Sequence, residues 1–189
     1  MDGGRLGSTR FCLVSFTSSD LVVMNWKNRF FWLAALGSLF LDRLTKYWVV
    51  GRFELTIPPE SWAFWPNVFH FTYVTNTGAF SLFSQGGDWL RWLSLGVSLI
   101  LIALGLFGPR MNRWEQVGYG CILGGAAGNG IDRFVSGRVV DFLDFRLIDF
   151  PVFNIADVFI NVGIACLLIA TFRNQDATKS GSQPDSSQQ

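Results

Sequence analysis

Four hydrophobic segments divide the chain, and each is close to the length of a membrane-spanning helix. They run from about 30 to 50, 89 to 107, 117 to 134 and 153 to 172. About 20 apolar residues are needed to cross the hydrocarbon core of a bilayer. The second segment is the most uniformly apolar and ends at Gly108-Pro109, a helix-stop signal. The pattern predicts an all-α membrane protein with four transmembrane helices.

Basic residues predict the orientation of these helices. They gather before the first segment, between the second and third, and after the fourth, as Lys27, Arg29, Arg110, Arg113, Arg173 and Lys179. Basic residues collect on the cytoplasmic side of membrane proteins. We therefore expect both termini in the cytoplasm, and the loops 51–88 and 135–152 on the outer side of the membrane.

The first outer loop has a pattern of its own. Residues 68–74, VFHFTYV, alternate β-branched and aromatic residues with others, which predicts a strand. Trp62, Phe64 and Trp65 lie among prolines, and aromatic rings of this kind favour the headgroup layer. A small β element on the membrane surface is expected here.

Composition excludes several classes of function. Half of the 189 residues are hydrophobic, only 15% are charged and the net charge is +1, so no nucleic-acid partner is expected. The chain has three widely spaced cysteines and one histidine, too few for a zinc site. We expect neither a metal nor another cofactor.

The two ends of the chain differ from the membrane unit. Residues 1–24 lack a long apolar core and a small-residue cleavage site. They are interpreted as a leader that is disordered or precedes the natural start at Met24. Residues 173–189 are polar and are predicted to form a disordered cytoplasmic tail. The membrane domain is therefore assigned to residues 25–172.

Polar residues inside the apolar segments are candidates for function, because charges near hydrocarbon are costly. Asp42 and Lys46 are four residues apart and are expected to pair on one helical face. Asn129 and Arg133 are spaced in the same way, and Asp132, which is next to Arg133, is expected to be neutralised within the protein. Small residues at 120, 124 and 128 predict close approach of a neighbouring helix.

Two further acids stand where an outer loop meets the membrane. Asp141 follows a short valine pair, and Asp157 comes three residues after Asn154, on the same helical face. If the fourth helix packs on the third, the two carboxyl groups can meet and share one proton. Such a pair activates water, as in aspartic proteases. Spacing alone leaves Asp144 and Asp149 as rival candidates.

Four motifs at these positions identify a resemblance. DRLTK, TNTGAF, GGAAGNGIDR with GRVVDF, and FNIAD occur in this order across residues 25–172. Together they resemble the lipoprotein signal peptidases (signal peptidase II). The resemblance implies four transmembrane helices with a small extracytoplasmic β-cradle. It also implies a metal-free aspartic endopeptidase that removes the signal peptide from diacylglyceryl-modified prolipoproteins, before the lipidated Cys.

The resemblance also assigns roles to residues. The catalytic pair falls on Asp141 and Asp157, and the substrate-binding or supporting residues are Asp42, Lys46, Asn76, Gly125, Asn129, Arg133 and Asn154. Expected partners are prolipoprotein substrates and membrane lipid, and a monomer is expected. One departure is visible: NTGAF has a single alanine where the family has two, which affects the placement of Phe80.

Two other classes of function are compatible with some of these residues. Membrane carboxylates also serve ion or proton carriers, although no inverted repeat is visible. A Ser–Lys peptidase would need Lys46 as its base, with Ser38 or Ser81 as nucleophile. Asp42 competes for that lysine, which disfavours the second alternative.

Overall fold

The computed structural model describes residues 28–78, 88–148 and 150–180. Its elements, in chain order, are α1 (Arg29–Arg52), β1 (Ser61–Trp65), β2 (Phe69–Asn76), α2 (Asp88–Phe107), α3 (Arg113–Ser136), β3 (Val139–Phe145) and α4 (Ile155–Ser180). The predicted helices and the predicted outer β element are both confirmed.

The helix α3 is the centre of the bundle, since it packs against α1, α2 and α4. Its small residues make this possible. A side chain at Gly120 would collide with the backbone of Phe31, and one at Gly124 would collide with the Ser38 hydroxyl, both in α1. The predicted close helix approach is confirmed.

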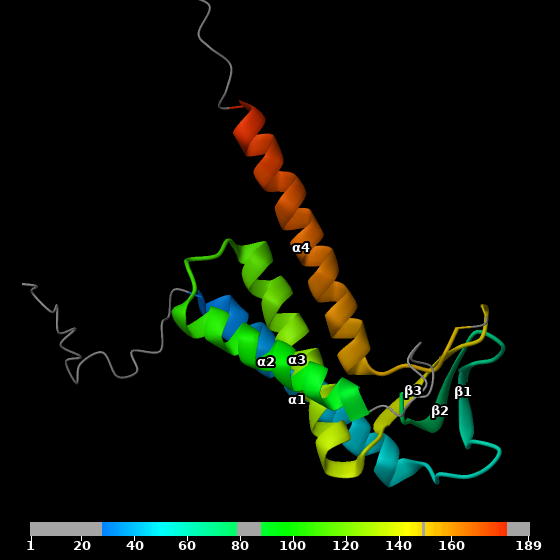
Figure 1. Cartoon of the computed structure of the whole chain (residues 1–189). Coiled ribbons are helices and arrows are strands. Elements are labelled where there is room, and N and C mark those ends of the chain that lie inside the picture. The colour runs from blue at the N-terminus through cyan, green and yellow to red at the C-terminus, as the bar shows by residue number, and fades with distance from the viewer. Residues whose placement is uncertain (1–27, 79–87, 149, 181–189) are drawn as a thin grey trace, which may run out of the picture.

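The strands form one antiparallel sheet with the order β1-β2-β3. It lies beyond the end of the bundle where α1 ends and α4 begins (Figure 1). The pairing of β2 with β3 places Val74 opposite Asp141 and Asn76 opposite Val139. A buried cluster that includes Val49 of α1 and Phe142 of β3 attaches the sheet to the bundle.

Three boundaries differ from those predicted. β1 and β3 were expected only as parts of outer loops, yet both are strands. α4 continues to Ser180, past the predicted end at 172, so the first part of the polar tail is helical. The leader 1–24, the end of the tail from 181, and Phe80 lie outside the described residues.

Only two helical stretches in the described part of the chain are long and apolar enough to cross a membrane by composition, Trp89–Phe107 and Ile155–Arg173. α1 and α3 have 24 residues each, roughly 36 Å at 1.5 Å per residue. Their length suffices for a crossing, but buried charges such as Asp42 and Asp132 interrupt their hydrophobic sequence.

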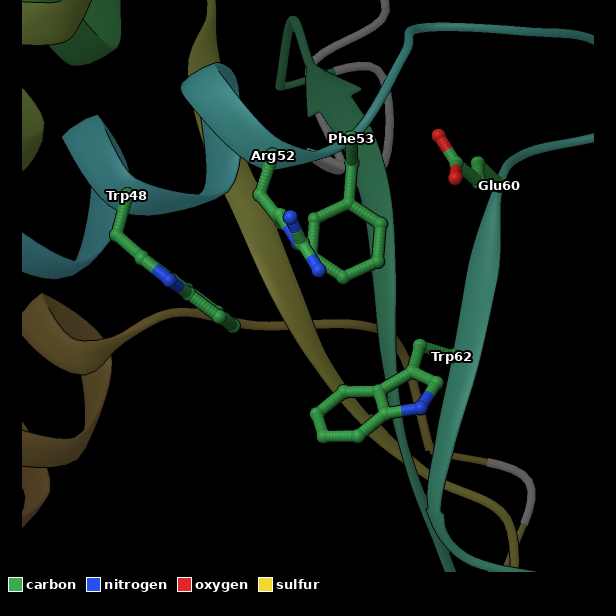
Figure 2. Close-up of a pocket in the computed structure, with 5 residues that line it drawn as sticks. All are labelled: Trp48, Arg52, Phe53, Glu60 and Trp62. Atoms are coloured by element: carbon green, nitrogen blue, oxygen red, sulfur yellow. The ribbon is translucent and has the colours of Figure 1, made fainter.

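Aromatic side chains cover the outer side of the sheet. A cavity of about 550 Å³ lies at the end of α1 and is lined by Trp48, Arg52, Phe53, Glu60 and Trp62 (Figure 2). Both indoles contact Phe71 of β2, at ring-centroid distances of 5.6 Å from Trp48 and 5.9 Å from Trp62. Phe64 and Trp65 of β1 are 65% and 64% exposed, as a membrane-surface aromatic belt requires.

Candidate active site

Asp141 and Asp157 line one cavity of about 680 Å³. Asp141 comes from β3, and Asp157 from the first turn of α4. The other lining residues are Asn76, Phe150, Pro151, Val152, Phe153, Val158, Asn161 and Val162. Two carboxyl groups from distant parts of the sequence thus face one largely apolar space.

Asn154 fixes the position of Asp157 by a reciprocal cap at the start of α4. Asp157 N donates to Asn154 Oδ1 at 3.1 Å, and Asn154 N donates to Asp157 Oδ2 at 3.2 Å. This exchange has the pattern of a capping box, in which side chains satisfy the free N–H groups of a first helical turn. The hydrogen bonds that cap the first turn of α4 therefore also hold the Asp157 carboxylate in place.

Asn154 also connects the two acids. Its Nδ2 donates to Asp141 Oδ1 at 2.6 Å and to Asn129 Oδ1 at 3.1 Å. Because Asn154 is fully buried, water does not compete for these bonds. One amide side chain thereby sets the relative position of the catalytic candidates.

Asn129 of α3 holds Asp157 from the other side. Its Nδ2 donates to Asp157 Oδ1 at 2.8 Å, while its Oδ1 accepts from Lys46 Nζ at 2.9 Å. The lysine and Asn154 both donate to that oxygen, so the orientation of the amide is fixed. Lys46 therefore acts on Asp157 through Asn129.

Four charges pack behind this amide. Lys46 pairs with Asp42 at 3.0 Å and with Asp132 at 2.7 Å, and Arg43 pairs with the same two acids, at 2.6 Å each. The predicted pairing of Asp42 with Lys46 is confirmed. The predicted neutralisation of Asp132 within the protein is confirmed, and the cations that pair with it, Arg43 and Lys46, come from α1.

The charge cluster also reaches α4. Asp42 Oδ1 accepts a hydrogen bond from Ala156 N at 3.1 Å, which satisfies one more free N–H group of the first turn. Asp42 is fully buried. It joins α1 to the helix that carries Asp157.

Arg133 forms no ion pair within 4 Å with an acid in the part of the chain that the structure describes. Its Nη1 donates to Ser94 Oγ of α2 at 3.3 Å. Its charge attracts Asp157, Asp141 and, more weakly, Asp132. Arg133 is therefore a cation near the two acids that is not held in a direct ion pair.

Burial changes the acidity of Asp141, which is 3% exposed. Burial, together with the negative charge of Asp157, raises the pKa of Asp141 from its ordinary 3.8 to about 6. Hydrogen bonds from Asn154 and Asn76 and the charge of Lys46 oppose this shift. Asp141 is therefore the acid suited to hold a proton near neutral pH.

Replacing Asp141 by Asn is expected to stabilise the fold above pH 6. The folded pKa is raised, so the stability contributed by the neutral carboxyl is present below 3.8 and is lost as the pH rises through about 6. Asn stays neutral and still accepts from Asn154, so the gain at neutral pH is about 3 kcal/mol. The free energy of unfolding of the variant and the wild type, measured in detergent at several pH values, tests this prediction. A difference between variant and wild type that is independent of pH contradicts this assignment.

Gly125 lets α4 approach α3 at the site. A Cβ there would lie 2.5 Å from Ala156 O and 2.7 Å from Ile160 Cγ1. These neighbours flank Asp157 along α4, so a side chain at 125 displaces the carboxylate.

We expect Gly125→Ala to lower peptidase activity at least about tenfold, because misplacement of catalytic groups by about 1 Å costs up to a hundredfold. Cleavage kinetics of the purified variant measure the loss. Gly37→Ala is the matched control, because nothing lies within 4 Å of its Cβ position. Equal activity of the two variants would show that the close approach of α3 and α4 at Gly125 is not needed for activity.

The rival acid on β3 has a different role. Asp144 Oδ2 accepts from Thr72 Oγ1 at 2.6 Å and from Arg146 Nε at 3.0 Å, and it is not among the residues that line the cavity. Asp149 lies outside the described residues. Ser38 donates to the carbonyl of Ala34, so it does not contact Lys46 as a Ser–Lys pair would require.

Two polar residues of the site were missed by the sequence reasoning. Arg43 holds both acids of the charge cluster; its position next to Asp42 within DRLTK was the available signal. Asn161 lines the cavity and donates to the carbonyl of Asp157 at 2.8 Å. Its spacing, four residues after Asp157, places it on the same face of α4.

Comparisons with known proteins identify one family that matches most of the chain. The model of the signal peptidase II family matches residues 34–173. A lipoprotein signal peptidase of Cyanothece sp. is 73% identical over 150 residues, 79% of this chain and 87% of that protein. One from Gloeobacter violaceus is 57% identical over 166 residues, 87% of this chain and 94% of that protein.

Solved structures of bacterial membrane enzymes share the fold. One superposes with a TM-score of 0.68 at 26% identity, covering 82% of this chain and 93% of its own. A second gives a TM-score of 0.66 at 29% identity, covering 74% and 90%. The matched region contains every residue of the buried network described above. The chain therefore belongs to the signal peptidase II family, the lipoprotein signal peptidases.

Proposed function

We propose that this chain is an aspartic endopeptidase that removes the signal peptide from diacylglyceryl-modified prolipoproteins, by hydrolysing the peptide bond before the lipidated Cys. One observation carries the proposal: Asp141 and Asp157 line the same cavity, with Asn154 bonded to both. Family membership supplies the substrate class.

The contacts support different roles for the two acids. Both oxygens of Asp157 accept N–H donors, from Asn129 and from the backbone of Asn154, and such donors stabilise a carboxylate. Burial and the nearby charge of Asp157 raise the pKa of Asp141 to about 6, so we assign the shared proton to Asp141. Asp157 is then the general base and Asp141 the general acid.

The reaction follows from these roles. Asp157 takes a proton from water as the water oxygen attacks the scissile carbonyl carbon, and Asp141 gives its proton to the carbonyl oxygen. In the second step a hydroxyl proton of the tetrahedral diol returns to Asp141. The amide nitrogen takes the proton from Asp157 as the C–N bond breaks. The products are the carboxyl end of the signal peptide and the amino group of the lipidated Cys.

The surroundings support a substrate that enters from the bilayer. Phe150, Val158 and Val162 line the cavity, and Phe150 and Val162 are 52% and 43% exposed. An apolar wall suits the hydrophobic part of a signal peptide and the acyl chains beside it. The side-chain bonds of Asn129 are directed at protein groups, so we assign it to positioning. Arg133 is the proposed contact for substrate carbonyl groups, and Asn76, which lines the cavity, is proposed to contact the substrate as well.

The topology completes the proposal. All four helices cross the membrane, with both termini in the cytoplasm and the sheet on the extracytoplasmic surface. The membrane unit of 25–172 acts as a monomer. Buried ion pairs support the crossings of α1 and α3, because pairing lowers the cost of placing Asp42, Arg43 and Lys46 at membrane depth.

Cleavage of a matched pair of precursors tests the proposed substrate. The purified protein is incubated with one prolipoprotein in its diacylglyceryl-modified form and in its unmodified form. We expect cleavage of the modified form before the lipidated Cys, and at least about a hundredfold slower cleavage of the unmodified form, because its lipid cannot contribute binding energy to the transition state. Equal rates for the two forms would contradict the substrate class.

A further inference from the structure

Two helices begin side by side at the end of the bundle that lies away from the acids. α1 begins at Arg29 and α3 at Arg113. Asn28 joins this end to the chain before α3, since its Nδ2 donates to Pro109 O and its Oδ1 accepts from Met111 N, at 3.1 Å each. Two positive helix ends therefore point to one region.

A cavity of about 590 Å³ opens between these helix starts. Its lining residues are Arg29, Phe30, Arg110, Met111, Asn112, Arg113 and Gln116. The polar groups of its floor are satisfied within the protein: Gln116 Oε1 accepts from Phe30 N, and Gln116 Nε2 donates to Met111 O. The guanidinium groups are the part of the lining that can bind a ligand.

Two of these arginines share one aromatic ring. The Cζ atoms of Arg29 and Arg113 lie 5.0 Å and 5.5 Å from the centroid of Phe30. Cation–π contact favours each of them singly, but two cations at one ring repel each other. Arg110 adds a third positive charge at the same cavity.

No carboxylate among the residues of 28–78, 88–148 and 150–180 forms an ion pair with any of these three arginines. The tendency of basic residues to lie on the cytoplasmic side accounts for their number. That tendency does not explain why all three arginines line one cavity. Nor does it explain why two of them contact the same ring. An anion in the cavity would relieve their mutual repulsion.

We propose that this cavity binds the headgroup of an anionic phospholipid. Arg29, Arg110 and Arg113 would hold the phosphate, for which the planar guanidinium group is suited. The site lies roughly 24 Å along α3 from Asn129, at the opposite face of the bilayer from the acids. A lipid is favoured over a soluble anion because Leu33, Phe107 and Trp114, which are 64%, 85% and 41% exposed, adjoin these helix ends and offer a surface to acyl chains.

The test compares lipid binding by the purified full-length protein in detergent. Delipidated protein is titrated with palmitoyl-oleoyl phosphatidylglycerol or with the matching phosphatidylcholine, and bound lipid is counted by native mass spectrometry. The site variant is Arg110→Gln/Arg113→Gln. Arg173→Gln is the matched control, because it removes an exposed charge from the C-terminal part of α4, outside the cavity.

We expect the wild type and Arg173→Gln to prefer phosphatidylglycerol at least about tenfold, and the site variant to lose this preference. Two results would overturn the proposal. One is an unchanged preference in the site variant; the other is full displacement of the lipid by inorganic phosphate, which would indicate a soluble anion. If the double variant does not fold, Arg29→Gln supplies the same comparison. Peptide cleavage is recorded alongside, so that failure of this site is distinguished from failure of the proposed peptidase.

Discussion

Replacing either Asp141 or Asp157 by Asn is expected to reduce the cleavage rate at least about a thousandfold, because in the proposed mechanism each acid transfers a proton in each step and a single such transfer contributes about 10²–10⁴. Both substitutions keep the size and shape of the side chain, because Asn and Asp are nearly isosteric. Asn at 141 also keeps the acceptor for Asn154, and Asn at 157 keeps an acceptor for Asn129. The loss should therefore appear in kcat with little change in KM.

The control for this prediction is Asp144→Asn. Asp144 lies on the same strand as Asp141, but it bonds to Thr72 and Arg146 and does not line the cavity. We expect it to retain wild-type cleavage within a factor of about two. If Asp144→Asn were as inactive as the two site variants, the loss would reflect damage to β3 and not lost proton transfer.

Replacing Lys46 by Met is expected to destabilise the protein by about 3–5 kcal/mol, the cost of breaking a buried ion pair by removing one partner. Lys46 is 4% exposed and contacts Asp42, Asp132 and Asn129. Without it, Arg43 is the remaining cation in contact with both acids. Asn129 also loses the donor that fixes its amide, so activity should fall at temperatures where the variant is still folded.

Arg146→Met is the matched control for Lys46→Met. Arg146 also pairs with an acid, Asp144, at 3.0 Å, but its side chain is 42% exposed, and exposed pairs contribute about 0–1 kcal/mol. Unfolding in detergent, followed at increasing denaturant, measures both variants. Equal destabilisation of the two would contradict the view that the charge cluster behind Asn129 is structurally important.

The helices were predictable because each coincides with a long segment rich in apolar residues. The same signal explains the error at the end of α4. Apolar sequence ends near Phe172, but polar residues continue the helix to Ser180. β1 and β3 escaped prediction for other reasons. β1 has only five residues and is exposed along its whole length, and the sequence of β3, VVDFLDF, does not alternate regularly between apolar and polar residues.

The catalytic candidates were predictable from motifs, whereas their connections were not. Spacing gave the pairing of Asp42 with Lys46, because the two residues lie on one helix. The contacts of Asp132 with Arg43 and Lys46 join residues more than eighty positions apart, and no local pattern reports them. The adjacent Arg133 was the obvious partner, but it donates to Ser94 of α2 instead.

Single-turnover cleavage tests the central claim most directly. The wild type, Asp141→Asn and Asp157→Asn are each mixed in excess with one diacylglyceryl-modified prolipoprotein, and product masses are followed with time. The account predicts that the wild type releases a signal peptide ending immediately before the lipidated Cys. Each Asn variant should leave the precursor intact over at least about a thousand wild-type half-lives. Release of the same products by either variant at a rate near that of the wild type would contradict the account.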